Sequence, residues 1–302
     1  RFLSQRGRGS IAERNAKLIL MVGVLGVSAS AILVRFSQAP SGVTAAYRLG
    51  WTVFLLLPVV LLRCRAELRR VTARDLVLCG ASGVLLALHF LTWFESLKRT
   101  SVASSTVLVS TEVIFTAMGF ALFLHGKIPR LGVWAILLAF GGSALLALSG
   151  GGGAGELSGN LLALATASAA AVYTLIGRIQ RGHLSTTVYT FLTYLACFLT
   201  LLLGTAAAGT PLTGYGGREW LIGLALAVLC TLLGHSLFSW CLKYLSPSYV
   251  SAAKLCEPVF SSLAAIPLFG EVPGPLQLAG GAAVLGAVLL YTWAEREKTP
   301  AG

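Results

Sequence analysis

The chain has 302 residues, of which 56% are hydrophobic and only 11% are charged, and its mean hydropathy is +0.82. A soluble domain carries roughly 25% charged residues, so this composition excludes a soluble globular protein and favours a chain that lies in a lipid bilayer. The net charge of +12 therefore does not indicate nucleic-acid binding. What matters is on which side of the membrane the positive charges lie.

Apolar runs long enough to cross a bilayer recur along the whole chain. A spanning helix needs about 20 mostly apolar residues. Ten such runs are present, over residues 18–34, 43–62, 76–97, 102–124, 131–148, 161–179, 188–207, 220–242, 249–269 and 276–293. The connectors are short and leave no room for a soluble domain. The sequence predicts an all-α integral membrane protein with ten transmembrane helices.

Positive charges predict which helix ends face the cytoplasm. If the N-terminus is inside, the inside segments hold most of the 23 Lys and Arg residues, and the outside connectors hold only Lys98, Arg99 and Arg218. Because basic residues are retained on the cytoplasmic side, we expect both termini in the cytoplasm and the protein in the cytoplasmic membrane. We interpret the Arg-rich segment 63–74 as a topology anchor, with a specific anionic-lipid site as the alternative.

The two halves of the chain resemble each other at an offset of 145 residues. Leu97 then falls on Leu242, and Glu112 falls on Glu257. Each repeat would contain five spans, an odd number, so the second repeat must insert upside down relative to the first. Inverted repeats around a site at the membrane midplane are the architecture of secondary transporters.

These boundaries divide the chain into five segments. We expect a cytoplasmic N-terminal segment (1–16), a first repeat with spans 1–5 (17–149), an extracytoplasmic linker (150–158), a second repeat with spans 6–10 (159–294) and a cytoplasmic tail (295–302). A fused pair of repeats needs no second chain to complete a central site, so we expect a monomer, with a dimer as the alternative.

Five short segments carry a resemblance to a known family. They are Ala-Ala-Tyr-Arg at 45–48, Leu-His-Phe-Leu-Thr-Trp-Phe-Glu-Ser-Leu at 88–97, Thr-Ser-Val-Ala-Ser-Ser at 100–105, Leu-Cys-Glu-Pro-Val-Phe at 255–260 and Phe-Gly-Glu at 269–271. With them the chain resembles the drug/metabolite transporter superfamily, and within it the EamA-type ten-helix carriers. The resemblance covers essentially the whole chain and implies two inverted five-helix repeats, cytoplasmic termini and a central cavity.

The chain departs from the family pattern at two places in the first half. The fourth span reads Glu112-Val113 where the family often has Pro, so we expect this span to be less kinked. After that span the chain reads His125-Gly126 where the family often has Gly-Glu or Lys-Glu. The glutamate signature of the first half is therefore missing.

Two glutamates at equivalent positions of the repeats are candidates for substrate binding or coupling. A charge within a span costs about 2.5–3.5 kcal/mol on insertion scales, so it needs a partner, water or a function. Glu112 and Glu257 suit proton coupling or capture of a substrate ammonium group. The structural alternative is that Glu257 pairs with Lys254 one turn earlier, and that Glu112 pairs with Arg48 or accepts hydroxyl hydrogen bonds.

The basic side chains in the spans have binding and structural interpretations. Arg48, which follows Tyr47 in the second span, could bind a substrate carboxylate bidentately, or it could lock its helix to an acid. Arg35 lies near the outer end of the first span, where we expect it to act as an anchor that extends to the interface. Glu95, at the outer end of the third span, could face water or Lys98.

Aromatic and histidine side chains predict a wall of a cavity. His89 and Trp93 are four residues apart and share a helical face in the third span, and His235 lies in the eighth span. Such a face suits an amino acid, an aromatic ring or an organic cation. The alternative is helix packing with an interfacial aromatic belt. Pro258, beside Glu257, is a candidate hinge because it removes a backbone hydrogen bond.

We therefore predict a secondary transporter that moves a small polar metabolite by alternating access. The resemblance implies an amino acid or a related compound as substrate and export as the direction. Protons are a candidate coupling ion, and an organic-cation transporter is the alternative. A membrane enzyme would need a nucleophile–base pair or a metal set, and the sequence shows neither. The six cysteines form no C-x-x-C pair, so we expect no metal, disulfide or cofactor, and no nucleic-acid partner.

Overall fold

The computed structural model describes residues 2–123, 128, 130–149, 154–180, 182–235, 237 and 255–296, and every regular element within them is helical. The elements are α1 (Phe2–Phe36), α2 (Ser41–Arg63), α3 (Arg65–Leu68), α4 (Ala73–Arg99), α5 (Val102–Val109), α6 (Glu112–Phe123), α7 (Arg130–Ser149), α8 (Ala154–Gln180), α9 (Thr186–Ala207), α10 (Gly217–Ala225), the π-helix η1 (Leu226–His235), α13 (Cys256–Phe269) and α14 (Pro275–Arg296).

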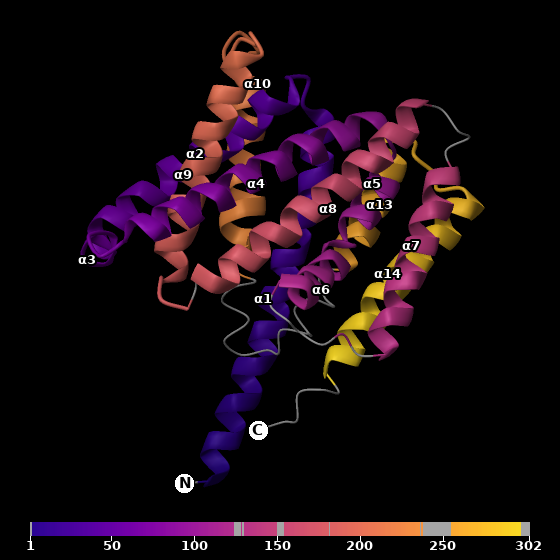
Figure 1. Cartoon of the computed structure of the whole chain (residues 1–302), viewed down its shortest axis with the longest axis horizontal. Coiled ribbons are helices and arrows are strands. Elements are labelled where there is room, and N and C mark those ends of the chain that lie inside the picture. Colours follow the sequence, from indigo (N-terminus) through magenta and orange to yellow (C-terminus); the bar gives the residue numbers. More distant parts are fainter. Residues whose placement is uncertain are drawn as a thin grey trace.

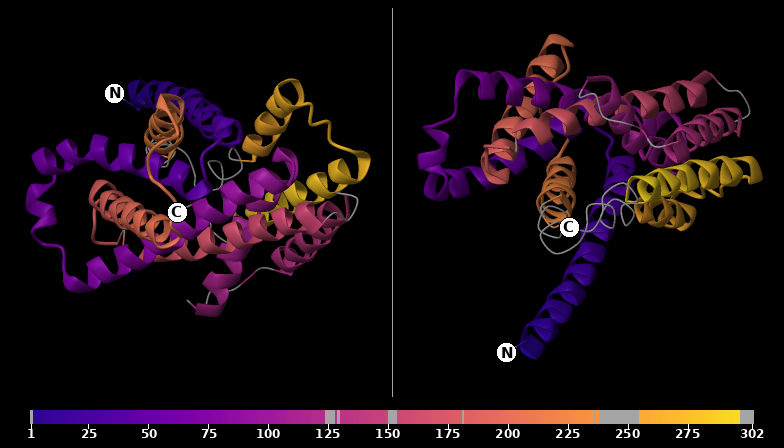
Figure 2. Two further views of the ribbon diagram at one scale, coloured as in Figure 1. Left: turned by 90° about the horizontal axis from the view of Figure 1, so that it is seen from above. Right: turned by 60° about the horizontal axis from the view of Figure 1, so that its bottom comes forward.

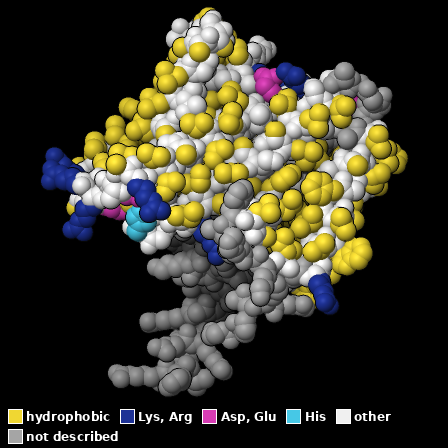
Figure 3. Space-filling view, in the orientation of Figure 1, with side chains coloured by type: hydrophobic (Ala, Val, Ile, Leu, Met, Phe, Trp, Pro, Cys, Tyr) yellow, Lys and Arg dark blue, Asp and Glu magenta, His cyan; other side chains and the backbone are white. Residues whose placement is uncertain are grey.

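Within the described residues, eight stretches of helix are long and apolar enough to cross a membrane, counting α5 with α6 and α10 with η1. Helices α7 and α13 are also apolar, and their described parts are shorter. Hydrophobic side chains cover much of the face that Figure 3 presents, and Leu62 and Trp134 are 83% and 67% exposed. Exposed apolar surface on this scale fits lipid rather than water. The chain is a multi-pass membrane protein.

The helices form a main bundle and a peripheral pair. In the bundle α4 packs against α8 and α9, α2 packs against α9, and α1 packs against η1. Helices α7 and α14 pack along each other at one side, as Figures 1 and 2 show. The N-terminal part of α1 projects beyond the bundle in both figures. The largest buried apolar cluster joins α1, α2, α4, α9 and η1, so the core lies where these helices meet.

Glycines allow the closest helix contacts. A Cβ on Gly142 of α7 would lie 2.9 Å from the carbonyl oxygen of Gly280 on α14. A Cβ on Gly83 of α4 would lie 2.7 Å from the carbonyl oxygen of Thr193 on α9. Small residues let membrane helices approach closely, because van der Waals contact holds them together in lipid. The small-residue stretch 279–283 of α14 thus forms a tight packing surface against α7.

The expectation of a less kinked fourth span is wrong. Helix α5 ends at Val109, and α6 begins at Glu112 after a turn at Ser110 and Thr111. The hydroxyl of Ser110 donates to the carbonyl oxygen of Thr106 at 3.0 Å, and that of Thr111 donates to Leu108 at 2.6 Å. Side chains that bond to the preceding backbone compete with the helical ladder. The break therefore needs no proline.

Candidate functional site

The site is centred on Arg48 of α2, of which only 2% is exposed. Its Nε donates to the hydroxyl of Thr231 at 2.9 Å, and its Nη1 donates to the hydroxyl of Ser30 at 3.1 Å. Its guanidinium carbon lies 4.4 Å from the centroid of the Phe90 ring, a cation–π contact. Side chains from α1, α4 and η1 thus meet at the guanidinium of α2.

The charge of Arg48 is not balanced by a directly bound acid. Both hydrogen-bond acceptors are neutral, and within the described part of the chain no carboxylate lies within 4.0 Å of its guanidinium nitrogens. A buried ion without an opposite charge costs several kcal/mol. A guanidinium in this setting can bind a carboxylate ligand with two parallel hydrogen bonds.

The π-helix η1 brings two further polar side chains to this point. Thr231 donates to the carbonyl oxygen of Leu226 at 3.3 Å, five residues earlier, while it accepts from Arg48. Cys230 donates to the carbonyl oxygen of Gly26 on α1 at 3.1 Å. A π-helix of ten residues is unusual, and π-turns occur frequently at functional sites.

Helix α9 completes the surroundings of the guanidinium. Tyr194 and Cys197 are 7% and 0% exposed, and both lie within electrostatic reach of Arg48. They belong to the same buried cluster as Phe90, Trp93 and the thiol of η1. The surroundings of the buried cation are therefore aromatic and weakly polar.

One face of α4 carries the predicted aromatic and histidine side chains into the same region. The ring of Trp93 lies 6.1 Å from that of His89, and His89 lies 5.2 Å from Phe90, the ring beneath Arg48. Trp93 is 5% exposed, and among the residues that the structure describes its indole N–H has no hydrogen-bond acceptor. The Nδ1 atom of His89 lies 3.3 Å from the carbonyl oxygen of Thr166 on α8.

Glu112 is the first residue of α6, directly after the break in the fourth span. It is half-buried, and its carboxylate accepts a hydrogen bond from the hydroxyl of Thr174 on α8 at 2.9 Å. It does not pair with Arg48. His89 lies within electrostatic reach of both Glu112 and Arg48, so the structure brings these three predicted residues to one region.

The corresponding acid of the second half also lies where a helix begins. Glu257 and Pro258 stand in the first turn of α13, directly after a turn at Leu255. A proline in the first helical turn removes no helical hydrogen bond, because the N–H groups there have no partner within the helix. The expectation that Pro258 acts as a hinge by removing a backbone hydrogen bond is therefore wrong. Lys254 lies outside the described residues, and His235 ends η1 without a described side chain.

Tyr47, the neighbour of Arg48 in sequence, points to a different part of the bundle. Its ring stacks on Trp220 of α10 with centroids 4.1 Å apart, and its hydroxyl donates to the carbonyl oxygen of Leu212 at 2.5 Å. These contacts hold α2 to α10 and to the connector before it. The structure thus separates Tyr47 from the side chains around the guanidinium.

Sequence reasoning missed the residues that surround Arg48. Ser30, Thr231 and Tyr194 are single polar residues within apolar runs, and no motif or spacing distinguishes them. Cysteines within spans often serve as small apolar packing residues, so the sequence does not mark Cys197 and Cys230 as part of a site. Only the packing of distant helices shows that they converge on one guanidinium.

Comparison with known proteins places this arrangement in a family. The model of the EamA-like transporter family matches the chain twice, over residues 15–148 and 157–293. The pseudopaline exporter CntI of Pseudomonas aeruginosa is 23% identical over 207 residues, which cover 68% of this chain and 72% of that protein. A probable terminal-alkyne amino-acid exporter of Streptantibioticus cattleyicolor is 27% identical over 233 residues, covering 74% and 75% of the two chains.

A solved crystal structure supports the same fold. It superposes with a TM-score of 0.61 at 19% sequence identity, and the match covers 95% of this chain and 99% of that chain. At this identity the likeness shows the fold alone. The two family matches together cover most of the chain, and the relatives are transporters rather than enzymes. The chain belongs to the EamA-like transporter family, within the drug/metabolite transporter type.

Proposed function

We propose that this transporter exports a small polar metabolite, an amino acid or a related compound, across the cytoplasmic membrane by alternating access. The relatives named as exporters of pseudopaline and of an amino acid support both the direction and the substrate class. The observation that carries the proposal is the buried Arg48 without an ion partner among the described residues, at the point where helices of both halves meet.

We propose ten spans in two inverted five-helix repeats, with both termini in the cytoplasm. The packing supports a two-fold relation between the halves. A shift of 145 residues maps α4 onto α10 and η1, α1 onto α8, and α2 onto α9. The packed pair α4–α8 therefore corresponds to the packed pair α1–η1, and the pair α4–α9 corresponds to α2–α10. The pairs α2–α9 and α7–α14 are their own counterparts. An odd number of spans in each repeat makes the second repeat inverted, as in many secondary transporters.

In this proposal Arg48 binds the carboxylate of the substrate. The guanidinium is already buried away from water, so it gives up few hydrogen bonds to water when it binds an anion. The hydroxyls of Ser30 and Thr231 hold its orientation, and the ring of Phe90 supports it from one face. The orphan indole N–H of Trp93 provides a further donor for a polar substrate atom.

The remaining predicted residues receive complementary roles. Glu112 and Glu257, each in the first turn after a break or turn in its span, bind the substrate ammonium group or carry a coupled proton. His89 lies within reach of the charges on Glu112 and Arg48 and lines the site. Pro258 would fix the point at which α13 begins, because the first helical turn accommodates a proline.

Three predicted residues remain. Lys254 and His235 belong to the second half, and Tyr47 belongs to the first. Lys254, three residues before Glu257 in the sequence, would balance that carboxylate when no substrate is bound. His235 would line the site opposite His89. Tyr47 would act indirectly, because its stack on Trp220 fixes the helix that carries Arg48.

A thermal-shift screen tests the substrate class with a matched set of ligands. Purified protein is heated with amino acids, with the corresponding amino-acid amides, which lack the carboxylate, and with quaternary ammonium compounds. We expect stabilisation by one or more amino acids and none by their amides, because only the acids offer an anion to Arg48. Equal stabilisation by acid and amide would contradict this role.

An organic cation is the second candidate substrate. The aromatic rings of Phe90 and Trp93 and the carboxylate of Glu112 favour it, since such groups attract quaternary ammonium ions. The guanidinium of Arg48 opposes it, because it already occupies one face of Phe90 and carries the same charge. Stabilisation by quaternary ammonium compounds that is lost in Trp93→Ala would favour this candidate over the first.

A further inference from the structure

At one end of the bundle, an ion pair between an arginine and a glutamate joins the two halves of the chain. Arg35, at the end of α1, donates from Nη2 to the carboxylate of Glu271, which follows α13 by two residues. The Nη1 of Arg35 donates to the carbonyl oxygen of Leu97 at the end of α4, at 2.5 Å. The other carboxylate oxygen of Glu271 accepts from the backbone N–H of Val102 at the start of α5, at 2.7 Å.

The pair is partly withdrawn from solvent and supported by aromatic rings. The side chains of Arg35 and Glu271 are 25% and 18% exposed. The guanidinium carbon lies 5.3 Å from the centroid of the Phe269 ring, and Phe269 lies 5.2 Å from Phe36. Charge-assisted hydrogen bonds of this kind are stronger than neutral ones. The pair therefore ties the ends of α1, α4, α5 and α13 together.

A second acid at the same end connects elements of one half only. Glu95 accepts from the hydroxyl of Ser41 at the start of α2, at 2.6 Å, and from Arg99 on its own helix at 3.3 Å. All three residues lie in the first half of the chain. Glu95 therefore offers a matched control for the pair that crosses between the halves.

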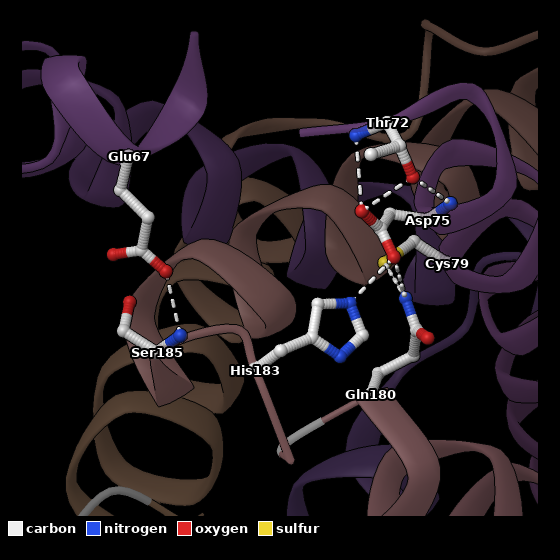
Figure 4. A network of polar contacts seen from close by, with 7 residues as sticks. All are labelled: Glu67, Thr72, Asp75, Cys79, Gln180, His183 and Ser185. Carbon is white, nitrogen blue, oxygen red and sulfur yellow. Dashed lines mark hydrogen bonds and ion pairs between the residues drawn. The ribbon is translucent and has the colours of Figure 1, made fainter. Parts of the chain in front are cut away.

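The opposite end of the bundle has a different network, shown in Figure 4. Asp75, in the first turn of α4, accepts from Gln180 at the end of α8 at 3.2 Å and lies 2.6 Å from the Nε2 of His183. Glu67 of α3 accepts from the backbone N–H of Ser185 at 2.6 Å. At the end that carries the Arg35–Glu271 pair, Glu219 in the first turn of α10 accepts from the hydroxyl of Ser37 and the backbone N–H of Gln38, which follow α1. The two acid networks occupy equivalent places in the repeat, but Asp75 has His183 of the other half as an ion-pair partner when that histidine is protonated. The position equivalent to His183 is Gln38, which carries no charge.

The Arg35–Glu271 pair has no counterpart in the repeat. At the offset of 145 residues Arg35 falls on Gln180, whose side-chain amide binds Asp75, and Glu271 falls on Gly126. Neither equivalent position carries a charge. One end of the transporter thus has a permanently charged pair between the halves, whereas the pair of Asp75 with His183 at the other end is ionic only when the histidine is protonated.

We propose that the pair between Arg35 and Glu271 is the latch of an extracytoplasmic gate. We propose also that its permanent charge, against a pair at the other end that is ionic only when a histidine is protonated, favours a resting state open toward the cytoplasm. This inference rests on the proposed alternating access and on the proposed orientation. The latch closes the outer ends of α1, α4, α5 and α13 around the site. Export then loads the substrate from the cytoplasm, and breaking the pair opens the release side.

The buried thiols beside Arg48 report which side is open, without engineered labels. Cys197 and Cys230 are both fully buried. A membrane-impermeant maleimide is added to right-side-out or to inside-out membrane vesicles, and mass spectrometry measures its attachment to these two residues. We expect the wild-type protein to react faster in inside-out vesicles.

Removal of the latch should open the outer side selectively. In Glu271→Gln and in Arg35→Gln the reaction in right-side-out vesicles should accelerate about tenfold, the effect of losing one charge-assisted hydrogen bond on an equilibrium. The double variant should react no faster than either single variant, because both changes remove the same pair. Glu95→Gln should react like the wild-type protein.

Each alternative result overturns the proposal in a recognisable way. An unchanged outside rate in Glu271→Gln shows that the pair is not a latch, and an equal acceleration from both sides shows a general loosening of the fold. A wild-type protein that reacts faster from outside contradicts the resting state. The reaction needs no substrate, so normal gating in a protein that transports no amino acid would overturn the proposed substrate and leave the latch standing.

Discussion

Replacement of Arg48 by Met separates a binding role from a structural one. The change removes two hydrogen bonds to neutral hydroxyls, at about 1 kcal/mol each, and a cation–π contact worth about 1–2 kcal/mol. The substitution also removes an unfavourable contribution of several kcal/mol, the cost of burying a charge that has no ion partner among the described residues. The two contributions nearly cancel, so we expect the Tm to change by no more than about 4 °C.

Ligand binding should respond much more strongly than stability. A carboxylate bound bidentately to Arg48 makes two charge-assisted hydrogen bonds, and at about 1.5 kcal/mol each their loss raises the Kd about 100-fold. The assay measures both quantities on one detergent-purified sample, the Tm by intrinsic fluorescence and the Kd by titration with the amino acid found in the thermal-shift screen.

Arg35→Met is the matched control for this experiment. It removes one partner of an ion pair and leaves Glu271 unpaired in a partly buried place, so it should lower the Tm more than Arg48→Met does. It should change the Kd little. A large loss of Tm in Arg48→Met with an unchanged Kd would refute the reasoning, because it would show that Arg48 serves the fold.

Three further changes test neighbouring parts of the site and the fold. Trp93→Phe keeps the ring but removes an N–H without a described partner, so it should leave the Tm unchanged and raise the Kd about tenfold; an unchanged Kd would remove this donor from the site. Glu112→Gln should abolish flux into proteoliposomes or its dependence on pH, and undiminished pH-dependent flux would exclude Glu112 from the mechanism. Gly83→Val would bring a Cβ within 2.5 Å of the Cβ of Ala196, so it should lower the Tm, whereas Gly80→Val, with open space around it, should not; equal Tm values for the two variants would contradict the packing.

The sequence predicts what depends on composition and local spacing. Long apolar runs indicate membrane helices because a bilayer offers no other partner for the backbone. A single charge such as Arg48 in an apolar run indicates a buried functional or paired group, because its insertion is costly. The helical spacing of His89 and Trp93 places both on one face, and the structure brings that face to the region of Arg48.

What the sequence does not predict depends on packing between distant segments. Thr231 reaches Arg48 across 183 residues, and Arg35 bonds Glu271 across 236, so no local pattern indicates either contact. The expectation that Arg35 is an anchor that extends to the interface did not include its pair with Glu271. The break before Glu112 follows from side chains that bond to the preceding backbone, which a rule based on proline overlooks.

Solute counterflow tests most directly whether a transported substrate binds to Arg48 through its carboxylate. Proteoliposomes are loaded with the stabilising amino acid, and the transient uptake of the same radiolabelled compound is followed for the wild-type protein and for Arg48→Met. We predict transient accumulation with the wild-type protein, competition by the acid but not by its amide, and no accumulation with Arg48→Met. Equal accumulation by the two proteins would contradict the account.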